Sequence, residues 1–155
     1  MKGEAAVINT LNNLLADELT AINQYMVQSE MCENWGYEKL HKQIGKTAID
    51  EMKHAEKLIE RILFLEGSPT VSKLNAMNIG SSVLAIHNNN LASEVAAVKA
   101  YNDAIAQCVQ AGDNGTRELL KAVLKDEEDH VDWLEAQLDQ IKQMGIQMYL
   151  AEQIH

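Results

Sequence analysis

The chain has 155 residues, of which 46% are hydrophobic and 23% charged, a composition typical of a globular protein with one substantial core. Its single proline, eight glycines and few aromatic residues favour helix over sheet, so we expect one all-α domain spanning residues 1–155. A formal net charge of −10 argues against a nucleic-acid groove, which needs clustered Lys and Arg, and suits a cation-binding protein.

The expected compartment follows from the cysteines and the N-terminal residues. Cys32 and Cys108 lie far apart without metal-ligand spacing and do not form a disulfide framework. Residues 1–15 contain no continuous apolar segment of a secretory signal, and no run is long enough to span a bilayer. We therefore expect a cytoplasmic protein without a membrane or nucleic-acid partner.

The first half of the chain predicts two helices, because apolar residues recur every three or four positions. The first spans roughly residues 5–33 and the second ends near residues 66–67, with a turn at residues 34–36 between them. Glu18 lies within the first apolar stripe and Glu51 within the second. The stripes comprise Ile8, Leu11, Leu15, Ile22 and Tyr25, then Ile44, Ala48, Ala55, Leu58, Ile62 and Leu65.

Residues 67–81 contain the only proline, Pro69, and show no helical stripe. This segment is long for a connection between helices and is predicted to be a crossover. A crossover that runs the length of a bundle lets the second and third helices point in the same direction.

The second half of the chain predicts two further long helices and a short fifth one. The third helix starts after Ser82 and is broken at residues 111–115, where Asp113 is the expected N-cap of the fourth. The fourth ends at Gly145, and residues 146–153 form the short helix. The stripes are Leu84, His87, Leu91, Val98, Tyr101, Ile105 and Cys108, then Leu120, Val123, Leu124, Val131, Leu134, Leu138 and Ile141.

A pattern of carboxylates and imidazoles occurs twice, 76 residues apart. In each copy a Glu is followed 33 residues later by Glu-x-x-His: Glu18 with Glu51 and His54, and Glu94 with Glu127 and His130. Each copy supplies one Glu from one helix and a Glu-x-x-His pair from the next, which is the ligand arrangement of di-iron and di-manganese carboxylate bundles.

The four Glu residues interrupt apolar stripes and would therefore bring four negative charges into the core. An unpaired buried ion costs several kcal/mol. No Lys or Arg occupies the stripes, so protons or metal cations must compensate, and two divalent ions would balance the charge. The oxygen-rich donor set suits iron or manganese better than structural zinc.

Two residue pairs flank these positions in both copies. Tyr25 and Tyr101 face the same stripe and either hydrogen-bond ligand carboxylates or are core tyrosines with other partners. Asp50 and Asp126 precede the Glu of each Glu-x-x-His by one residue, about 100° around the helix, so we expect them to face away from the metal pair toward solvent.

With these residues assembled, the sequence closely resembles the bacterioferritin family over essentially its whole length. The resemblance is carried by residues 21–25 (Ala-Ile-Asn-Gln-Tyr), 50–56 (Asp-Glu-Met-Lys-His-Ala-Glu), 61–67 (Arg-Ile-Leu-Phe-Leu-Glu-Gly) and 126–130 (Asp-Glu-Glu-Asp-His). It implies a ferritin-like four-helix bundle with a ferroxidase centre, in which Glu51 and Glu127 bridge two irons. Glu18 and His54 would complete one iron, and Glu94 and His130 the other.

The resemblance also implies an assembly and a second cofactor. The family forms 24-subunit cages that oxidise Fe(II) with dioxygen or peroxide and store the ferric mineral inside, and a ferredoxin is the expected reductant for iron release. Haem b is held between two subunits by paired methionines, here Met52. The surrounding residues would be Leu19, Ile22, Asn23, Met26 and Ile49.

Other positions of the family pattern are only partly matched. Lys46 stands where many members have a histidine that joins Asp50 in an inner-surface iron site, so that site is not expected here. Positions lining an inter-subunit iron channel are matched by Asn34, Glu66, Asp132 and Asp139.

Two other functions share parts of this pattern. A rubrerythrin-like di-iron peroxidase has the same bundle and ligands but usually carries a Cys-x-x-Cys module, which this chain lacks. A haem electron-transfer protein or a purely structural bundle would not need all six ligands.

Overall fold

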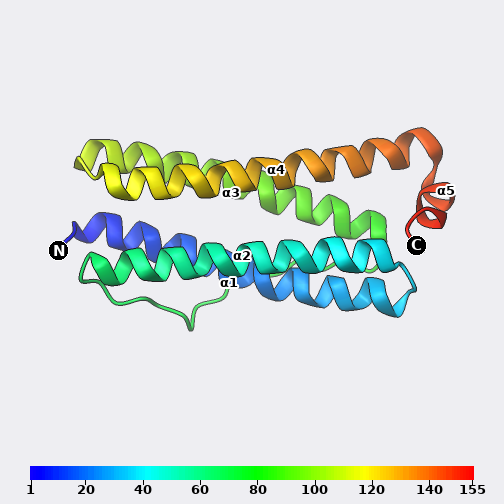
Figure 1. Ribbon diagram of the computed structural model, residues 1–155, viewed down its shortest axis with the longest axis horizontal. Helices are drawn as coiled ribbons and strands as arrows, with labels where there is room; N and C mark the ends of the chain where they lie inside the picture. The colour runs from blue at the N-terminus through cyan, green and yellow to red at the C-terminus, as the bar shows by residue number, and fades with distance from the viewer.

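The computed structural model describes residues 1–155 and contains five helices and no strand. They are α1 (Ala5–Asn34), α2 (Glu38–Phe64), α3 (Val83–Ala111), α4 (Asn114–Met144) and α5 (Ile146–Ala151). The four long helices lie side by side and α5 turns across one end of the bundle (Figure 1). None of the helices combines the length and apolar character needed to cross a membrane. The all-α fold with a short fifth helix is confirmed.

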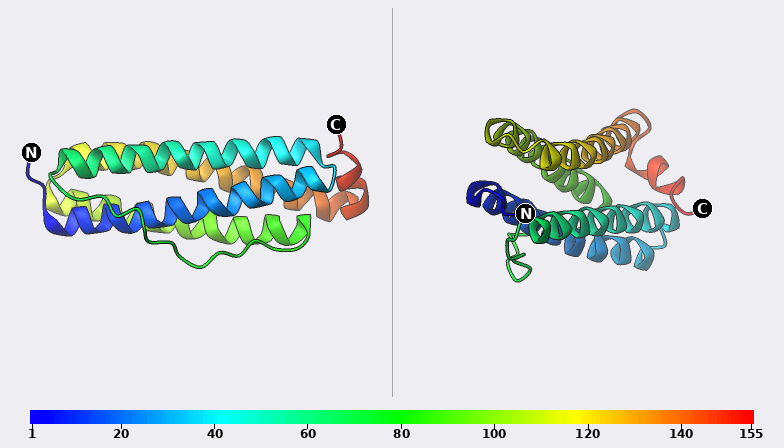
Figure 2. Two further views of the ribbon diagram at one scale, coloured as in Figure 1. Left: turned by 90° about the horizontal axis from the view of Figure 1, so that it is seen from below. Right: turned by 60° about the vertical axis from the view of Figure 1, so that its left-hand side comes forward.

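Residues 65–82 form the crossover between α2 and α3, so these two helices run in the same direction (Figure 2). The crossover follows α1, whose polar side chains hold it. Asn12 Oδ1 accepts from the Thr70 amide at 2.7 Å, Thr20 Oγ1 from the Asn75 amide at 2.9 Å, and Gln24 Oε1 from an amide further along. These contacts satisfy backbone donors that no helix or strand can pair.

Local capping explains where the helices begin and end. The Ser82 side chain accepts from the Ala85 amide at 3.2 Å, and Asp113, as expected, caps α4 by accepting from the Thr116 amide at 3.0 Å. Gly112 closes α3 in the left-handed conformation that glycine adopts without steric cost (φ +68°). After α2, the left-handed residue is Glu66 (φ +63°) rather than the neighbouring Gly67.

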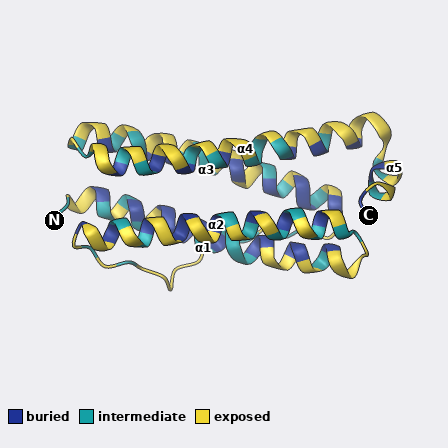
Figure 3. Ribbon diagram, viewed as in Figure 1, coloured by how far each residue is buried: buried dark blue, intermediate teal, exposed yellow.

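The buried side chains form two apolar clusters, one in each half of the bundle. One contains residues such as Leu11, Leu58 and Val123, and the other residues such as Ile44 and Ile86. Buried residues line the facing sides of the helices in both halves (Figure 3). The prediction that Leu84 faces the core is wrong. Leu84 is exposed, because the first turn of α3 buries Val83 and Ile86 instead.

Candidate metal centre

The six predicted ligands come together between the two apolar clusters. Glu18 comes from α1, Glu51 and His54 from α2, and the other three from α3 and α4. Their burial is nearly complete: the five residues Glu18, Glu51, His54, Glu94 and Glu127 are 1–2% exposed, and the His130 side chain is 11% exposed. Burial on this scale requires charge compensation within the cluster.

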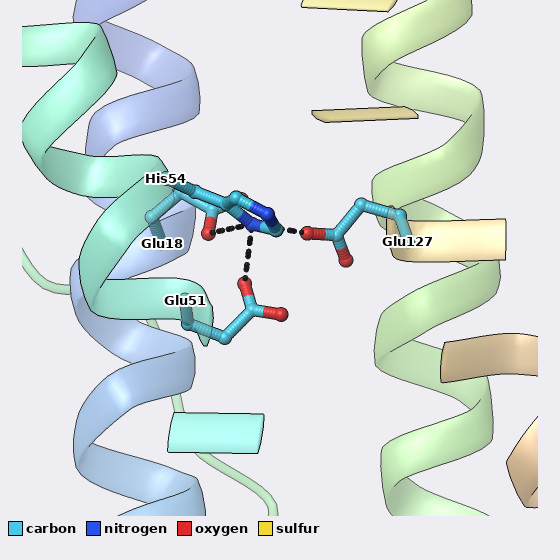
Figure 4. Close-up of side chains that lie close together, drawn as sticks. All are labelled: Glu18, Glu51, His54 and Glu127. Atoms are coloured by element: carbon cyan, nitrogen blue, oxygen red, sulfur yellow. Dashed lines mark ion pairs between the residues drawn. The ribbon is translucent and has the colours of Figure 1, made fainter. Parts of the chain in front are cut away.

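The His54 ring lies among three carboxylates from three helices (Figure 4). Its Nδ1 is 2.9 Å from Glu127 Oε1, 3.4 Å from Glu18 Oε2 and 3.7 Å from Glu51 Oε2. Ligands of a single metal ion at about 2.1 Å are separated by about 3–4 Å, so these four atoms have the spacing of one coordination sphere.

His130 repeats this arrangement for the other hairpin. Its Nδ1 is 3.0 Å from Glu51 Oε1, 3.4 Å from Glu94 Oε1 and 3.8 Å from Glu127 Oε2. Glu51 and Glu127 thus take part in both groups, each with its two oxygens divided between His54 and His130. The two imidazole centroids are 6.3 Å apart, so the groups are adjacent and share two carboxylates.

The unsatisfied polar atoms of the core indicate what the cluster lacks. Each of the six residues has one fully buried side-chain N or O atom that makes no hydrogen bond of normal geometry. Four of these atoms form close imidazole–carboxylate pairs, His54 Nδ1 with Glu127 Oε1 and His130 Nδ1 with Glu51 Oε1. Buried polar atoms are nearly always hydrogen-bonded, so six such atoms at one place indicate a site for a ligand. Metal cations fit, because the atoms are oxygen and imidazole donors in two overlapping groups.

The ionisation of the cluster shows how its charge is balanced without a cation. Burial, followed by the neighbouring Glu51 for Glu18 and Glu127 for Glu94, raises the pKa of Glu18 and Glu94 well above the ordinary value. Burial acts in the same direction on Glu51 and Glu127, but contacts with the protonated carboxyls and the imidazoles lower their pKa overall.

The imidazoles supply the positive charge of this balance. Burial opposes the protonation of His54 and His130, but contacts with the surrounding carboxylates outweigh it and raise the pKa of both. These directions favour protons on Glu18, Glu94 and both imidazoles, and ionised carboxylates at Glu51 and Glu127. That distribution of protons carries no net charge over the six residues.

The two tyrosines contact ligand carboxylates across the bundle. Tyr25 from α1 donates to Glu94 on α3, and Tyr101 from α3 donates to Glu18 on α1 at 2.9 Å. Of the two roles that the sequence left open, the structure shows the contact with the carboxylates. Each tyrosine fixes the orientation of a carboxylate that belongs to the other hairpin.

The prediction for Asp50 and Asp126 is confirmed in part: their side chains are 31% and 48% exposed, but each also contacts a ligand imidazole. Asp126 Oδ2 is 2.8 Å from Nε2 of His54, and Asp50 Oδ2 is 3.4 Å from Nε2 of His130. Both side chains point away from the ligands of their own helix, and each contacts Nε2 of the imidazole that belongs to the opposite hairpin. A carboxylate on the second nitrogen directs the first nitrogen of a histidine toward a metal.

Two cavities reach the cluster. One of about 340 Å³ is lined by His130, Asp50 and Asp126 together with Lys46. The other, of about 200 Å³, ends at ligand carboxylates including Glu18 and is bordered by the crossover. Small ions and water therefore have space to approach the ligands from two sides.

The remaining predicted residues lie on the surface of the single chain. Met52, Met26 and Ile49 are 45%, 52% and 50% exposed, so these residues of the expected haem position are open to solvent in the single chain. Leu19, Ile22 and Asn23 are partly exposed. The four expected channel residues, Asn34, Glu66, Asp132 and Asp139, are all exposed.

Comparisons with known proteins agree with this fold. Residues 8–144 match the family model of the ferritin-like domain. The chain is 42% identical over 147 residues to a bacterioferritin of Rhodobacter capsulatus, covering 95% of this chain and 91% of that protein. It is 42% identical over 155 residues to a bacterial ferritin of Synechocystis sp., covering 99% of both. A bacterioferritin of Mycolicibacterium paratuberculosis is 37% identical over 152 residues, 98% of this chain and 96% of that protein.

The bundle, the long crossover and the extent of the family match make this chain a member of the ferritin-like proteins. Its identity of 37–42% to these relatives along nearly the whole length narrows the assignment. Among ferritin-like proteins, the chain belongs to the bacterioferritin family.

Proposed function

We propose that this protein oxidises Fe(II) at the six-residue cluster and stores the product as a ferric mineral. The convergence of six buried ligand atoms, none with a hydrogen bond of normal geometry, on one place is the observation that carries the proposal. Membership of the bacterioferritin family supports iron as the metal.

In the proposed arrangement, Glu51 and Glu127 bridge the two ions. Glu18 and His54 complete the coordination of one, and Glu94 and His130 that of the other. Two Fe(II) ions held together supply two electrons, which reduce dioxygen to hydrogen peroxide or hydrogen peroxide to water.

The residues around the ligands fix their orientation and charge during this chemistry. Tyr25 and Tyr101 hold the carboxylates of Glu94 and Glu18, while Asp50 and Asp126 hold the imidazoles. Because Asp126 and Asp50 contact Nε2 of His54 and His130, Nδ1 of each imidazole is the atom available for the metal. The buried site therefore needs little reorganisation when an ion arrives.

Storage requires an enclosed space, for which we propose a 24-subunit cage of this chain with haem b between paired subunits. The exposure of Met26, Ile49 and Met52 supports this part of the proposal, because large apolar side chains that gather on a surface mark an interaction site. A cytoplasmic location and a ferredoxin reductant belong to the same proposal.

An aerobic Fe(II) titration of the metal-free assembled protein tests both activities. We expect rapid oxidation of about two irons per chain, followed by slower retention of far more iron in a large particle. Saturation at two irons with nothing stored would instead indicate a di-iron oxidoreductase related to rubrerythrin.

A pair of variants ties the fast phase to the cluster. Glu94→Gln removes one ligand charge, and we expect the initial oxidation rate to fall at least about tenfold, the scale found when even outer partners of a metal site are removed. Glu128→Gln is the matched control, because the exposed Glu128 lies on the same bundle outside the cluster. Equal rates in the two variants would contradict the assigned centre.

A further inference from the structure

A second group of possible metal ligands lies near the turn that joins α1 to α2. It consists of Glu30 and Glu33, in the last two turns of α1, and His41 in the first turns of α2, with ligand atoms all within 4.8 Å of one another. Glu30 is 12 residues beyond Glu18, or about 18 Å along the helix axis, so this group is separate from the six-residue cluster.

The hydrogen bonds of His41 fix which of its nitrogens faces the carboxylates. The Ser29 hydroxyl oxygen lies 3.0 Å from His41 Nδ1 and donates its proton to the His41 carbonyl at 2.8 Å, so this oxygen can accept from Nδ1. His41 Nδ1 is 3.0 Å from the Ser29 carbonyl oxygen, which can only accept. Nδ1 therefore carries the proton in the neutral ring, and Nε2 presents its lone pair. A backbone carbonyl behind one imidazole nitrogen is the usual support of a metal-binding histidine.

The position of Nε2 agrees with a cation between it and the carboxylates. Nε2 is 3.8 Å from Glu33 Oε1, beyond hydrogen-bond length and within the separation of two ligands on one ion. The His41 side chain is only 24% exposed, so the ring is held in place by its surroundings. Gly45 contributes to this, since a Cβ there would lie 3.0 Å from Ser29 Oγ and displace the hydroxyl that contacts His41.

The charges around the group are uncompensated. Neither Glu30 nor Glu33 forms an ion pair with a Lys or Arg, and the nearby Lys42 pairs with Glu38 at 3.4 Å. Both Glu residues lie at the C-terminal end of α1, whose last turn has no basic residue. The partial negative charge of a helix C-terminus disfavours acidic side chains and favours a cation.

We propose that Glu30, Glu33 and His41 bind one divalent transition-metal ion of the zinc or iron(II) type, with water in the remaining positions. The imidazole distinguishes this site from the exposed acidic groups that bind magnesium or calcium, which prefer all-oxygen ligands. The site is independent of the oxidation centre and links α1 to α2.

Zinc binding to the metal-free assembled protein tests the proposal, by equilibrium dialysis in excess magnesium to occupy all-oxygen sites. We expect about three zinc ions per chain in the unchanged protein, two in the six-residue cluster and one at His41. His41→Gln should lower the number to about two. The double variant Glu30→Gln with Glu33→Gln should have the same effect. The matched control is Glu56→Gln with Glu60→Gln, two residues that are likewise exposed but lie on α2, and it should still bind about three zinc ions per chain.

A second measurement observes His41 itself. Diethyl pyrocarbonate acylates accessible imidazole nitrogens, and zinc should protect His41 at least about tenfold in the unchanged protein but not in the Glu30 and Glu33 double variant. Two zinc ions per chain with no protection of His41 would overturn the proposal. A third ion that survives His41→Gln would also overturn it, because the ion would then lie elsewhere. Neither result would affect the Fe(II) oxidation assay.

Discussion

Metal binding at the six-residue cluster should release about two protons per ion. Without a cation, we expect the cluster to hold four dissociable protons, one on each of Glu18, Glu94, His54 and His130, because the pKa of each group is raised. With two divalent ions, charge balance needs four ionised carboxylates and two neutral imidazoles. The difference is four protons for two ions, and the buried cluster is neutral in both states.

This count fixes a pH dependence and its sign. Since the metal-free protein binds more protons than the loaded one, metal affinity rises with pH, and two protons per ion correspond to about a hundredfold increase in each binding constant per pH unit. The dependence should weaken once the pH exceeds the raised pKa values of the carboxyls, where metal no longer displaces their protons.

An anaerobic titration measures the release directly. Fe(II), or zinc as an ion without redox chemistry, is added to metal-free protein in a weakly buffered solution, and the base needed to hold the pH constant is recorded. Glu94→Gln should reduce the release from about four protons per chain to about three, whereas Glu128→Gln should leave four. Release of fewer than about one proton per ion in the unchanged protein would refute the proposed ionisation of the cluster.

Three further changes test features outside the ligand set. Asp126→Asn should weaken binding of the ion at His54 by about 10–100-fold, because it replaces the carboxylate behind the imidazole; its matched control is Asp129→Asn, an exposed residue of the same helix. His87→Gln should make unfolding by denaturant less sensitive to acid. Burial lowers the pKa of His87 to about 4 from the ordinary 6.5, so the native ring resists protonation while the unfolded one accepts it, and stability worth up to about 3 kcal/mol is lost as the pH falls from 6.5 to 4. Glu66→Gly should raise the free energy of unfolding by up to about 1 kcal/mol, because Glu66 occupies the left-handed region, whereas Glu60→Gly within α2 should lower it by about as much.

The acidic ligands of the cluster could be predicted from the sequence because each one is a charged residue within an otherwise apolar helix stripe. The apolar stripe of a helix identifies the side chains that face the core. Glu18 and Glu94 lie within such stripes and are therefore buried, however the helices pack in detail. The repeat at 76 residues then places the two halves in equivalent positions. The helix ends were predictable where capping residues such as Asp113 act locally.

The partners of the imidazoles could not be predicted by the same means. Periodicity gives the direction of a side chain relative to its own helix, and Asp126 does leave that helix away from Glu127. The contact of Asp126 with His54 depends on how the second hairpin packs against the first, and the hydrophobic pattern of a single helix does not predict that packing. One signal was present in the sequence: Asp50 and Asp126 recur at the same 76-residue offset as the ligands.

The supporting contacts cross between hairpins, and this links metal binding to the docking of the two halves. The crossing pairs are Tyr25 with Glu94, Tyr101 with Glu18, Asp126 with His54 and Asp50 with His130. Neither hairpin can orient its own ligands alone, so an ion that binds only the docked arrangement stabilises it. The gain is about 2.7 kcal/mol per ion at a free concentration one hundred times the dissociation constant. When no ion is bound, the charges of the six ligand residues between the two apolar clusters must be balanced in another way. Protons meet that requirement, so the same four protons that neutralise the metal-free core are the ones an arriving pair of ions must displace.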